Sequence, residues 1–194
     1  MTKLTGLYLH TNYFSQSLPS EMSNIKNLVI LDLSTNGFTG SLPAEICGGG
    51  ALQHLSVVDN HFSGMIPKSL RNCSSLRRFR LGGNQFKDDI SQAFGVYPHL
   101  YFMDLSGNNL YGELSDNWKT CDNLTSLLIS GNQISGGIPP DFGTMYKLER
   151  LDLSANKLEA NRFSGSIPAG MGNFQGLLSL NLGKITSTGQ FQFK

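Results

Sequence analysis

An asparagine recurs in this chain at every twenty-fourth position over most of its length. The members of this asparagine ladder are Asn12, Asn36, Asn60, Asn84, Asn108, Asn132 and Asn156. The first leucine of each unit keeps the same interval, at positions 4, 28, 52, 76, 100, 124 and 148. Such a period predicts a solenoid of stacked units, because one unit of this length cannot bury its apolar face alone.

Each unit follows the pattern Leu-x-x-Leu-x-Leu-x-x-Asn-x-Phe-x-Gly-x-Ile-Pro. The alternating Leu-x-Leu stretch predicts one short strand per unit, so that the units together build a parallel sheet. We expect each ladder asparagine to bond backbone groups of neighbouring turns, which otherwise lie buried and unpaired. The Gly-x-Ile-Pro stretch predicts a tight turn. The apolar column two positions after the asparagine should form an internal spine of Phe14, Phe38, Phe62, Phe86, Leu110, Ile134 and Leu158.

Three segments carry Ser/Thr-Gly-x-Ile/Leu-Pro after a phenylalanine, at residues 38–43, 62–67 and 163–168. With the leucine ladder they resemble the plant-specific leucine-rich repeat, over residues 1 to about 182. The resemblance implies an α/β solenoid: a right-handed leucine-rich-repeat superhelix with a concave parallel β-sheet and a mostly 3-10 or irregular convex side. The segment Phe94-Gly95-Val96-Tyr97-Pro98, together with Gly112–Trp118, resembles one group of plant receptor kinases that sense secreted peptides.

The ladder loses its register after Asn156. Asn161 opens a second Asn-x-Phe-Ser-Gly-x-Ile-Pro, and the next leading leucine, Leu177, follows Leu148 after a longer step than any before it. Either five residues are inserted or 19 are lost, and we favour the loss because a complete repeat tail begins at Asn161. We therefore expect a repeat domain over 1–182, with about seven regular repeats and an aberrant one at 148–176, and an irregular or disordered tail at 183–194.

Neither end of the chain has the polar cap that a terminal repeat needs, so we expect an exposed last apolar layer and a fragment or truncated product of a longer protein. No signal peptide precedes the first repeat, and no apolar run reaches the roughly 18 residues of a transmembrane helix. The net charge of +1 gives no reason to expect nucleic-acid or anionic membrane binding.

Three cysteines are present. Cys73 and Cys121 occupy the same slot two repeats apart, about 10 Å at the sheet spacing, which is too far for a disulfide. Cys47 and Cys73 lie in neighbouring repeats, and a bridge between them is the alternative to the free buried thiols that we predict. Two sequons, at Asn72 and Asn123, are glycan acceptors if the chain is secreted, or else ordinary polar positions.

Outward-facing side chains of the predicted sheet form three columns, in which neighbours are one strand apart and touch. The first column holds Gly6, Ile30, His54, Arg78, Phe102, Ser126 and Arg150. The second holds Tyr8, Asp32, Ser56, Arg80, Asp104, Leu128 and Asp152. The third holds His10, Ser34, Val58, Gly82, Ser106, Ser130 and Ser154.

The predicted ligand-binding cluster is centred on an Arg-x-Arg pair. Arg78 and Arg80 lie two residues apart on one strand, and such a pair can fork onto a carboxylate or sulfate. It resembles the Arg-x-Arg pair with which some plant receptor kinases hold a peptide hormone's terminal carboxylate. Alternatively, Arg80 pairs with Asp104 and Arg78 stacks on Phe102, which would leave the pair as surface decoration. The full predicted set is His54, Ser56, Arg78, Arg80, Phe102 and Asp104.

The pattern favours recognition over catalysis. No nucleophile–base pair emerges, and the four histidines are not at metal-ligand spacing, so we expect no enzyme activity, cofactor or metal. The resemblance implies the extracellular ligand-recognition portion of a plant leucine-rich-repeat receptor kinase or receptor-like protein, acting in signalling or defence at the plasma membrane. Its partners would be a secreted peptide or protein and a co-receptor. The alternatives are a secreted inhibitor of cell-wall-degrading enzymes and a non-functional truncated remnant.

Overall fold

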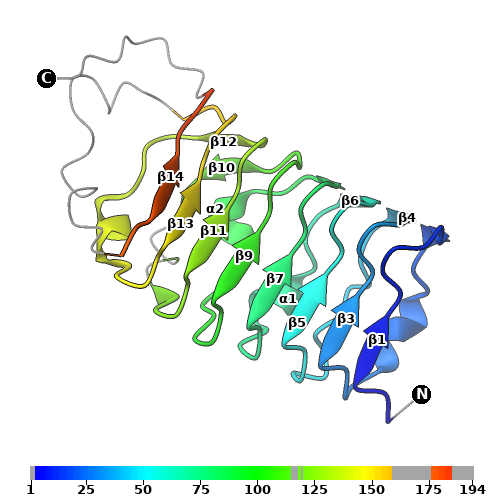
Figure 1. Ribbon diagram of the computed structural model, residues 1–194. Coiled ribbons are helices and arrows are strands. Elements are labelled where there is room, and N and C mark those ends of the chain that lie inside the picture. The colour runs from blue at the N-terminus through cyan, green and yellow to red at the C-terminus, as the bar shows by residue number, and fades with distance from the viewer. Residues whose placement is uncertain (1–2, 115–117, 119, 159–175, 185–194) are drawn as a thin grey trace, which may run out of the picture.

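The computed structural model describes residues 3–114, 118, 120–158 and 176–184. The chain coils so that each unit contributes one strand to a long parallel sheet, and the strands lie side by side along the molecule (Figure 1). In spatial order the strands of this main sheet are β1 (Gly6–Tyr8), β3 (Ile30–Asp32), β5 (His54–Ser56), β7 (Arg78–Arg80), β9 (Phe102–Asp104), β11 (Ser126–Leu128), β13 (Arg150–Asp152) and β14 (Ser179–Asn181).

The register of the main sheet follows the period of the sequence. From β1 to β13 each residue lies opposite its equivalent in the next unit, as in the pairing of Gly6 with Ile30. The last pair breaks this rule, because Arg150 lies opposite Ser179, which is five positions beyond the next step of the period. The strands β13 and β14 thus still pair in parallel, although the unit between them departs from the period. Asn161 and the segment 163–168, on which the choice between insertion and loss depended, lie outside the described residues.

The middle residue of each strand points into the core. Leu31, Leu55, Phe79, Leu127 and Leu151 are essentially fully buried, because successive side chains of a strand alternate between its two faces. Behind them the predicted spine is present: the rings of Phe38, Phe62 and Phe86 stack, with centroids 5.9 and 6.3 Å apart. Phe14 begins this stack 5.9 Å from Phe38, and its side chain is 45% exposed.

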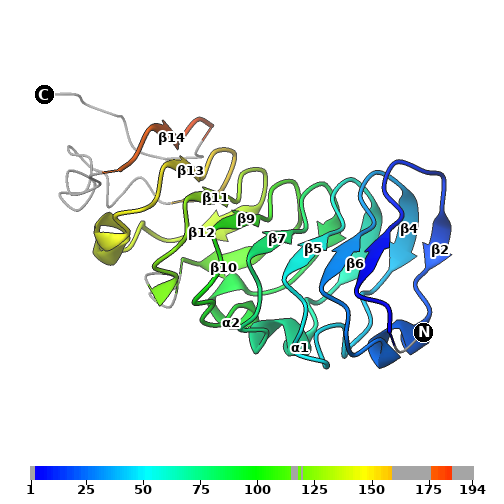
Figure 2. The ribbon, with the colours of Figure 1, turned by 60° about the horizontal axis from the view of Figure 1, so that its bottom comes forward.

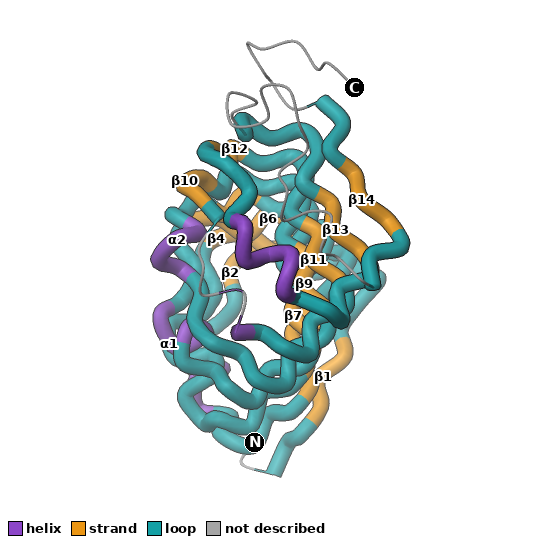
Figure 3. The backbone as a smooth tube through the Cα atoms, turned by 90° about the vertical axis from the view of Figure 1, so that its left-hand side faces the viewer, coloured by secondary structure: helices purple, strands orange, loops and turns teal. Residues whose placement is uncertain are grey.

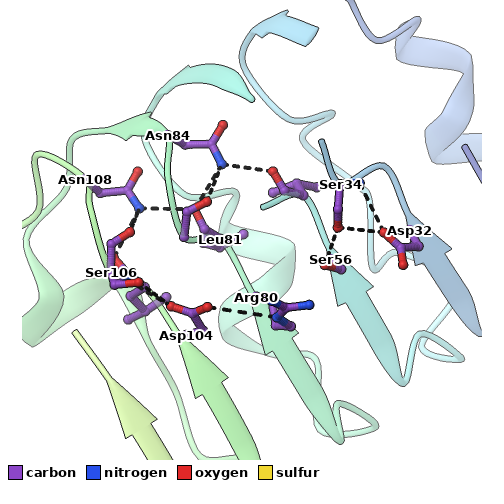
Figure 4. Close-up of polar contacts among 12 residues, drawn as sticks. Asp32, Ser34, Ser56, Arg80, Leu81, Asn84, Asp104, Ser106 and Asn108 are labelled. Carbon is purple, nitrogen blue, oxygen red and sulfur yellow. Dashed lines mark hydrogen bonds and ion pairs between the residues drawn. The ribbon is translucent and has the colours of Figure 1, made fainter. Parts of the chain in front are cut away.

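The asparagine ladder is structural, as its sequence context predicts. Asn84 Nδ2 donates to the carbonyl oxygens of Val57 at 2.9 Å and Leu81 at 3.0 Å, while its Oδ1 accepts from Phe62 N at 3.0 Å. Each such carbonyl oxygen accepts from two successive asparagines of the ladder. Leu81 O, for example, also accepts from Asn108 (Figure 4). The same bonds repeat along the ladder, which therefore satisfies backbone groups where every turn leaves its strand.

A second set of parallel pairings follows the bend, and the sequence pattern does not predict it. The spine residues lie in or beside short strands, which also explains why the rings stack in register. Gly40 and Gly64 end two of these strands with φ of 73° and 80°, a left-handed conformation that glycine adopts without strain. These strands are β2 (Ser15–Ser17), β4 (Gly37–Gly40), β6 (His61–Gly64) and β8 (Gln85–Phe86), and separately β10 (Tyr111–Glu113) and β12 (Gln133–Ser135).

Short helices occupy the side of the solenoid away from the main sheet (Figures 2 and 3). They are η1 (Ser20–Asn24), α1 (Lys68–Arg71), α2 (Ile90–Ala93) and η3 (Pro140–Thr144). The mostly 3-10 or irregular convex side is thereby confirmed. None of the helices that the structure describes is long and apolar enough to cross a lipid bilayer.

The aromatic residues of the segment that resembles peptide-sensing receptors are part of the core. Phe94 packs edge-on against Trp118, with ring centroids 5.8 Å apart, and Tyr97 packs against Phe79 at 6.4 Å. Phe142 extends the same cluster at 6.4 Å from Trp118. These aromatic residues fill the space between the main sheet and the helical side, so their role in this chain is packing.

The prediction of free thiols is wrong for two of the three cysteines. Cys47 and Cys73 form a disulfide, with their Cα atoms 6.0 Å apart. Two consecutive turns, Gly48 N to Glu45 O and Gly50 N to Cys47 O, replace a helix in this repeat. They shift Cys47 along the helical side until it faces α1, which removes the offset of two positions seen in the sequence. Cys121 is a free buried thiol, as predicted.

The C-terminal layer is exposed, as expected. Leu180 holds the inward position of β14, yet 39% of its surface is accessible, whereas its neighbour Leu151 is buried. The predicted tail begins at residue 183, and its part from 185 to 194 lies outside the described residues.

Candidate functional site

The exposed face of the main sheet carries the predicted columns. In the first column His54 lies between Ile30 and Arg78, and in the second Ser56 lies between Asp32 and Arg80. The next strand places Phe102 opposite Arg78 and Asp104 opposite Arg80. The register therefore brings all six predicted ligand-binding residues together on β5, β7 and β9.

Side chains of β9 contact both arginines of the pair. The Arg78 guanidinium carbon lies 4.5 Å from the centroid of the Phe102 ring. Arg80 Nε lies 3.9 Å from Asp104 Oδ2, at the long end of an ion pair (Figure 4). Both contacts named as alternatives to ligand binding are thus present. A surface ion pair of this length contributes little stability, and it orients Arg80 without using up its donors.

Asp104 is itself held in place from its own turn. Its Oδ1 accepts from Ser106 Oγ at 2.6 Å and from Ser106 N at 3.1 Å. The lack of a side chain at Gly82 leaves room for this carboxylate, since a Cβ there would lie 2.9 Å from Asp104 Oδ1. The carboxylate that supports Arg80 is therefore preorganised. Among the described residues, the buried Nε of Arg80 has no hydrogen-bond partner.

An open hollow of about 260 Å³ lies on the N-terminal side of the arginine pair. The hollow is centred on β5. The sequence instead predicts that the ligand-binding residues cluster most densely around β7. Phe102 and Asp104 are not in its lining; they stand behind the arginines. The residues that line the hollow are Ile30, Leu31, Asp32, His54, Leu55, Ser56, Arg78 and Arg80.

The far wall of the hollow is polar and consists of the predicted Ser56 and of Asp32, which was not in the predicted set. Asp32 Oδ1 accepts from Ser34 Oγ at 2.6 Å, and Ser34 Oγ is 2.6 Å from Ser56 Oγ (Figure 4). Asp32 stands beside Ser56 in the second column, so its column position was the signal that could have found it. Cationic groups thus line one side of the hollow, and the Asp32 carboxylate and the Ser56 hydroxyl, both held by Ser34, line the other.

His54 lines the hollow and lies opposite Arg78 on the neighbouring strand. Burial lowers the pKa of His54, and the positive charges of Arg78 and then Arg77 lower it further. The imidazole is therefore held neutral at pH 7, where it can both donate and accept a hydrogen bond.

The remaining predicted site residues lie elsewhere. Asn72 is at the end of α1 on the helical side, and Asn123 is at the sheet edge just before β11. The ladder asparagines follow the strands of the main sheet, where each turn bends toward the shorter strands, and they form no part of the hollow. Across the described part of the chain, no group of three or more His, Cys, Asp or Glu side chains is placed to hold a metal ion.

The family model described as Leucine Rich Repeat matches residues 27–48, 51–73, 123–145 and 147–174. Together with the repeating register of the sheet, this match places the chain in the leucine-rich-repeat family. A search of curated protein sequences gives no match.

Solved structures similar to this chain include ectodomains of plant receptor kinases. The ectodomain of the membrane receptor kinase GASSHO1/SCHENGEN3 from Arabidopsis thaliana, solved with CASPARIAN STRIP INTEGRITY FACTOR 2, is 36% identical. Its TM-score is 0.86, over 93% of this chain and 21% of that one. The Arabidopsis receptor kinase HAESA, solved with the peptide hormone IDA and the co-receptor SERK1, is 30% identical. Its TM-score is 0.83, over 96% of this chain and 34% of that one. This chain thus spans about a fifth to a third of their lengths.

Proposed function

We propose that this chain is the ligand-recognition portion of a plant leucine-rich-repeat receptor kinase or receptor-like protein. Its ligand would be a secreted peptide or protein that presents an anionic group to the concave sheet, and a co-receptor would join the complex. The observation that carries the proposal is the hollow beside Arg78 and Arg80, whose guanidinium groups are backed by Phe102 and Asp104. The similar solved ectodomains, which were crystallised with peptide ligands, support it.

The chemistry of the hollow favours a carboxylate or sulfate. Two guanidinium groups on one strand provide forked donors for such an anion. The opposite wall, with Asp32 and Ser56, suits hydroxyl, amide or ammonium groups of the same ligand. A peptide with an acidic group and a neighbouring polar or basic residue satisfies both walls.

The native placement that we propose is the extracellular face of the plasma membrane. The Cys47–Cys73 disulfide supports it, because disulfides persist in oxidising compartments and are rare in the cytosol. The relatives support it as well, since both are receptor kinase ectodomains.

Replacing both arginines of the pair should weaken the binding of an anionic peptide. The double variant Arg78→Ala/Arg80→Ala removes two charge-assisted donors and should raise Kd by about tenfold or more. Isothermal titration calorimetry with a peptide that ends in a free carboxylate measures the effect. Arg150→Ala is the matched control, because Arg150 belongs to the same column but lies three strands away. An unchanged Kd for the double variant contradicts the proposal.

Anion binding in the hollow should also take up a proton at His54. A bound anion offsets the charge of Arg78, which is one cause of the lowered pKa, so the pKa of His54 rises in the complex. Affinity should therefore increase roughly threefold as pH falls from 7.5 to 5.5, through the ordinary histidine value. Besides Arg77 and Arg78, the charged residues that line the hollow with His54 are Asp32 on β3 and Arg80 on β7.

This pH dependence is measurable by calorimetry in buffers that differ in ionisation enthalpy. His54→Gln should flatten the dependence while leaving the affinity at pH 7.5 within about twofold, because glutamine keeps a donor and an acceptor but does not titrate. Equal slopes for the two proteins would assign the dependence to another group.

A further inference from the structure

The sequon Asn72-Cys73-Ser74 lies at the end of α1, on the side of the solenoid that faces away from the main sheet (Figure 2). Asn72 and Ser74 are exposed, whereas Cys73 between them is only 2% exposed and is bonded to Cys47. The acceptor of a glycan and one end of a disulfide thus occupy neighbouring positions.

We propose that Asn72 is an N-glycosylation site whose modification must precede closure of the Cys47–Cys73 disulfide, so that its occupancy depends on how quickly that disulfide forms. The proposal rests on the secretory route that an extracellular chain takes. It does not depend on what the concave sheet binds.

The folded sequon is locked by its backbone as well as by its sulfur atom. The N–H groups of Asn72 and Cys73 both donate to Leu70 O, and Ser74 N donates to Asn72 O at 3.0 Å. The three residues therefore form a tight turn. A transferase that reads Asn-x-Ser/Thr has to draw the tripeptide into its own site, which requires this turn to open locally.

The disulfide makes that opening much harder. Before oxidation, Cys73 can leave the core together with the end of α1, and only hydrogen bonds and apolar packing oppose this movement. After oxidation, Cys73 is tied to Cys47 of the preceding repeat, and Cys47 N also lies 3.5 Å from Ser69 Oγ in α1. Local unfolding then has to include both repeats, which raises its free-energy cost.

The two competing reactions differ in what they consume. In glycosylation, Nδ2 of Asn72 attacks the anomeric carbon of a lipid-pyrophosphate-linked oligosaccharide. The bond from that carbon to the pyrophosphate oxygen breaks, and the amide proton passes to a base. In oxidation, the thiols of Cys47 and Cys73 pass two protons and two electrons to an oxidised dithiol carrier of the secretory pathway. Because Asn72 is exposed, a glycan there leaves later disulfide closure free.

The second sequon provides an internal comparison. Asn123-Leu124-Thr125 also has a buried middle residue, but that residue is a leucine without a covalent lock. Core packing of Leu124 and hydrogen bonds hold it: Asn123 Nδ2 donates to Pro98 O at 2.7 Å, and Thr125 Oγ1 donates to Tyr101 O at 2.9 Å. Occupancy of Asn123 therefore reports general access during folding and not the state of the disulfide.

The test is to express the whole chain behind a secretion signal in plant cells and to measure the occupancy of both sequons by mass spectrometry after enzymatic deglycosylation in ¹⁸O water. The wild type is compared with Cys47→Ser, which leaves the sequon intact and removes the lock. A second arm treats cells that express the wild type with a membrane-permeant thiol reductant during synthesis, so that the result does not depend on the folding of a variant.

We expect Asn72 to be partly occupied in the wild type and its unmodified fraction to fall by about twofold or more in Cys47→Ser and under reductant, with Asn123 unchanged. Equal occupancy of Asn72 in all three samples overturns the ordering. If Asn72 carries no glycan in any of the three samples, the proposal that it is a glycosylation site is wrong. A parallel rise at Asn123 means that general unfolding causes the effect, and it too overturns the proposal.

Discussion

Asn84→Ala should lower the free energy of unfolding by about 3 kcal/mol, because it leaves the buried N–H of Phe62 without a partner. The carbonyl groups lose less, since Leu81 O and Val57 O each also accept from a neighbouring rung. The loss is thus concentrated on one orphaned donor in a site that alanine cannot refill. Urea unfolding followed by circular dichroism measures it.

Asn12→Ala is the matched control, since it makes the same change on the same ladder. Asn12 is exposed, and within the described part of the chain its side-chain Nδ2 donates to Leu9 O and His10 O of its own turn. Its loss should cost less than about 1 kcal/mol. Equal losses for Asn12→Ala and Asn84→Ala would mean that the ladder acts through helix or turn preference and not through the bonds between turns.

Phe62→Ala should lower the free energy of unfolding by about 4 kcal/mol. The ring is fully buried and lies between those of Phe38 and Phe86, so its removal leaves a cavity with stacked rings on both sides. The parallel backbone pairing of β4, β6 and β8 holds the neighbouring rings in register and limits how far they can collapse into the space.

Two further variants locate the cause of this loss. Phe14→Ala changes the end of the same stack, where the ring is partly exposed and has one ring neighbour, and should cost about half as much. Phe62→Leu should cost only about 1 kcal/mol, because leucine already fills the same column at positions 110 and 158. If Phe62→Leu is as destabilising as Phe62→Ala, the ring stack itself contributes the stability, and the filled volume does not.

The three outward columns could be read from the sequence because a parallel sheet with one strand per period keeps its register. Each residue is then opposite its equivalent in the next unit. The repeat period alone therefore places His54 on one side of Arg78 and Phe102 on the other. The position of the hollow could not be read in this way. It depends on how far the side chains of Asp32 and Arg80 reach and on which groups already hold them, Ser34 for Asp32 and Asp104 for Arg80.

The disulfide is a second feature that the repeat period does not predict. Counted along the repeat, Cys47 and Cys73 are offset by two positions, and the period alone disfavours their pairing. On the strands, the period predicts which residues of successive repeats are neighbours, because the hydrogen bonds of the sheet keep them in register. On the helical side it predicts this poorly, because each repeat has its own turn or helix there. Cys47 lies in such a turn, and only its actual path brings it 6.0 Å from Cys73, measured between Cα atoms.

By itself the amino-acid sequence determined the solenoid, the inward leucines, the role of the asparagine ladder and the membership of each outward column. All of these follow from one repeated set of short-range spacings, which every unit satisfies in the same way. The second set of strands, the Cys47–Cys73 bond, the packing role of the Phe94 and Trp118 aromatics and the centring of the hollow on β5 were decided by the tertiary structure. They depend on where side chains of different repeats meet in space, and that distance is not a property of any single unit.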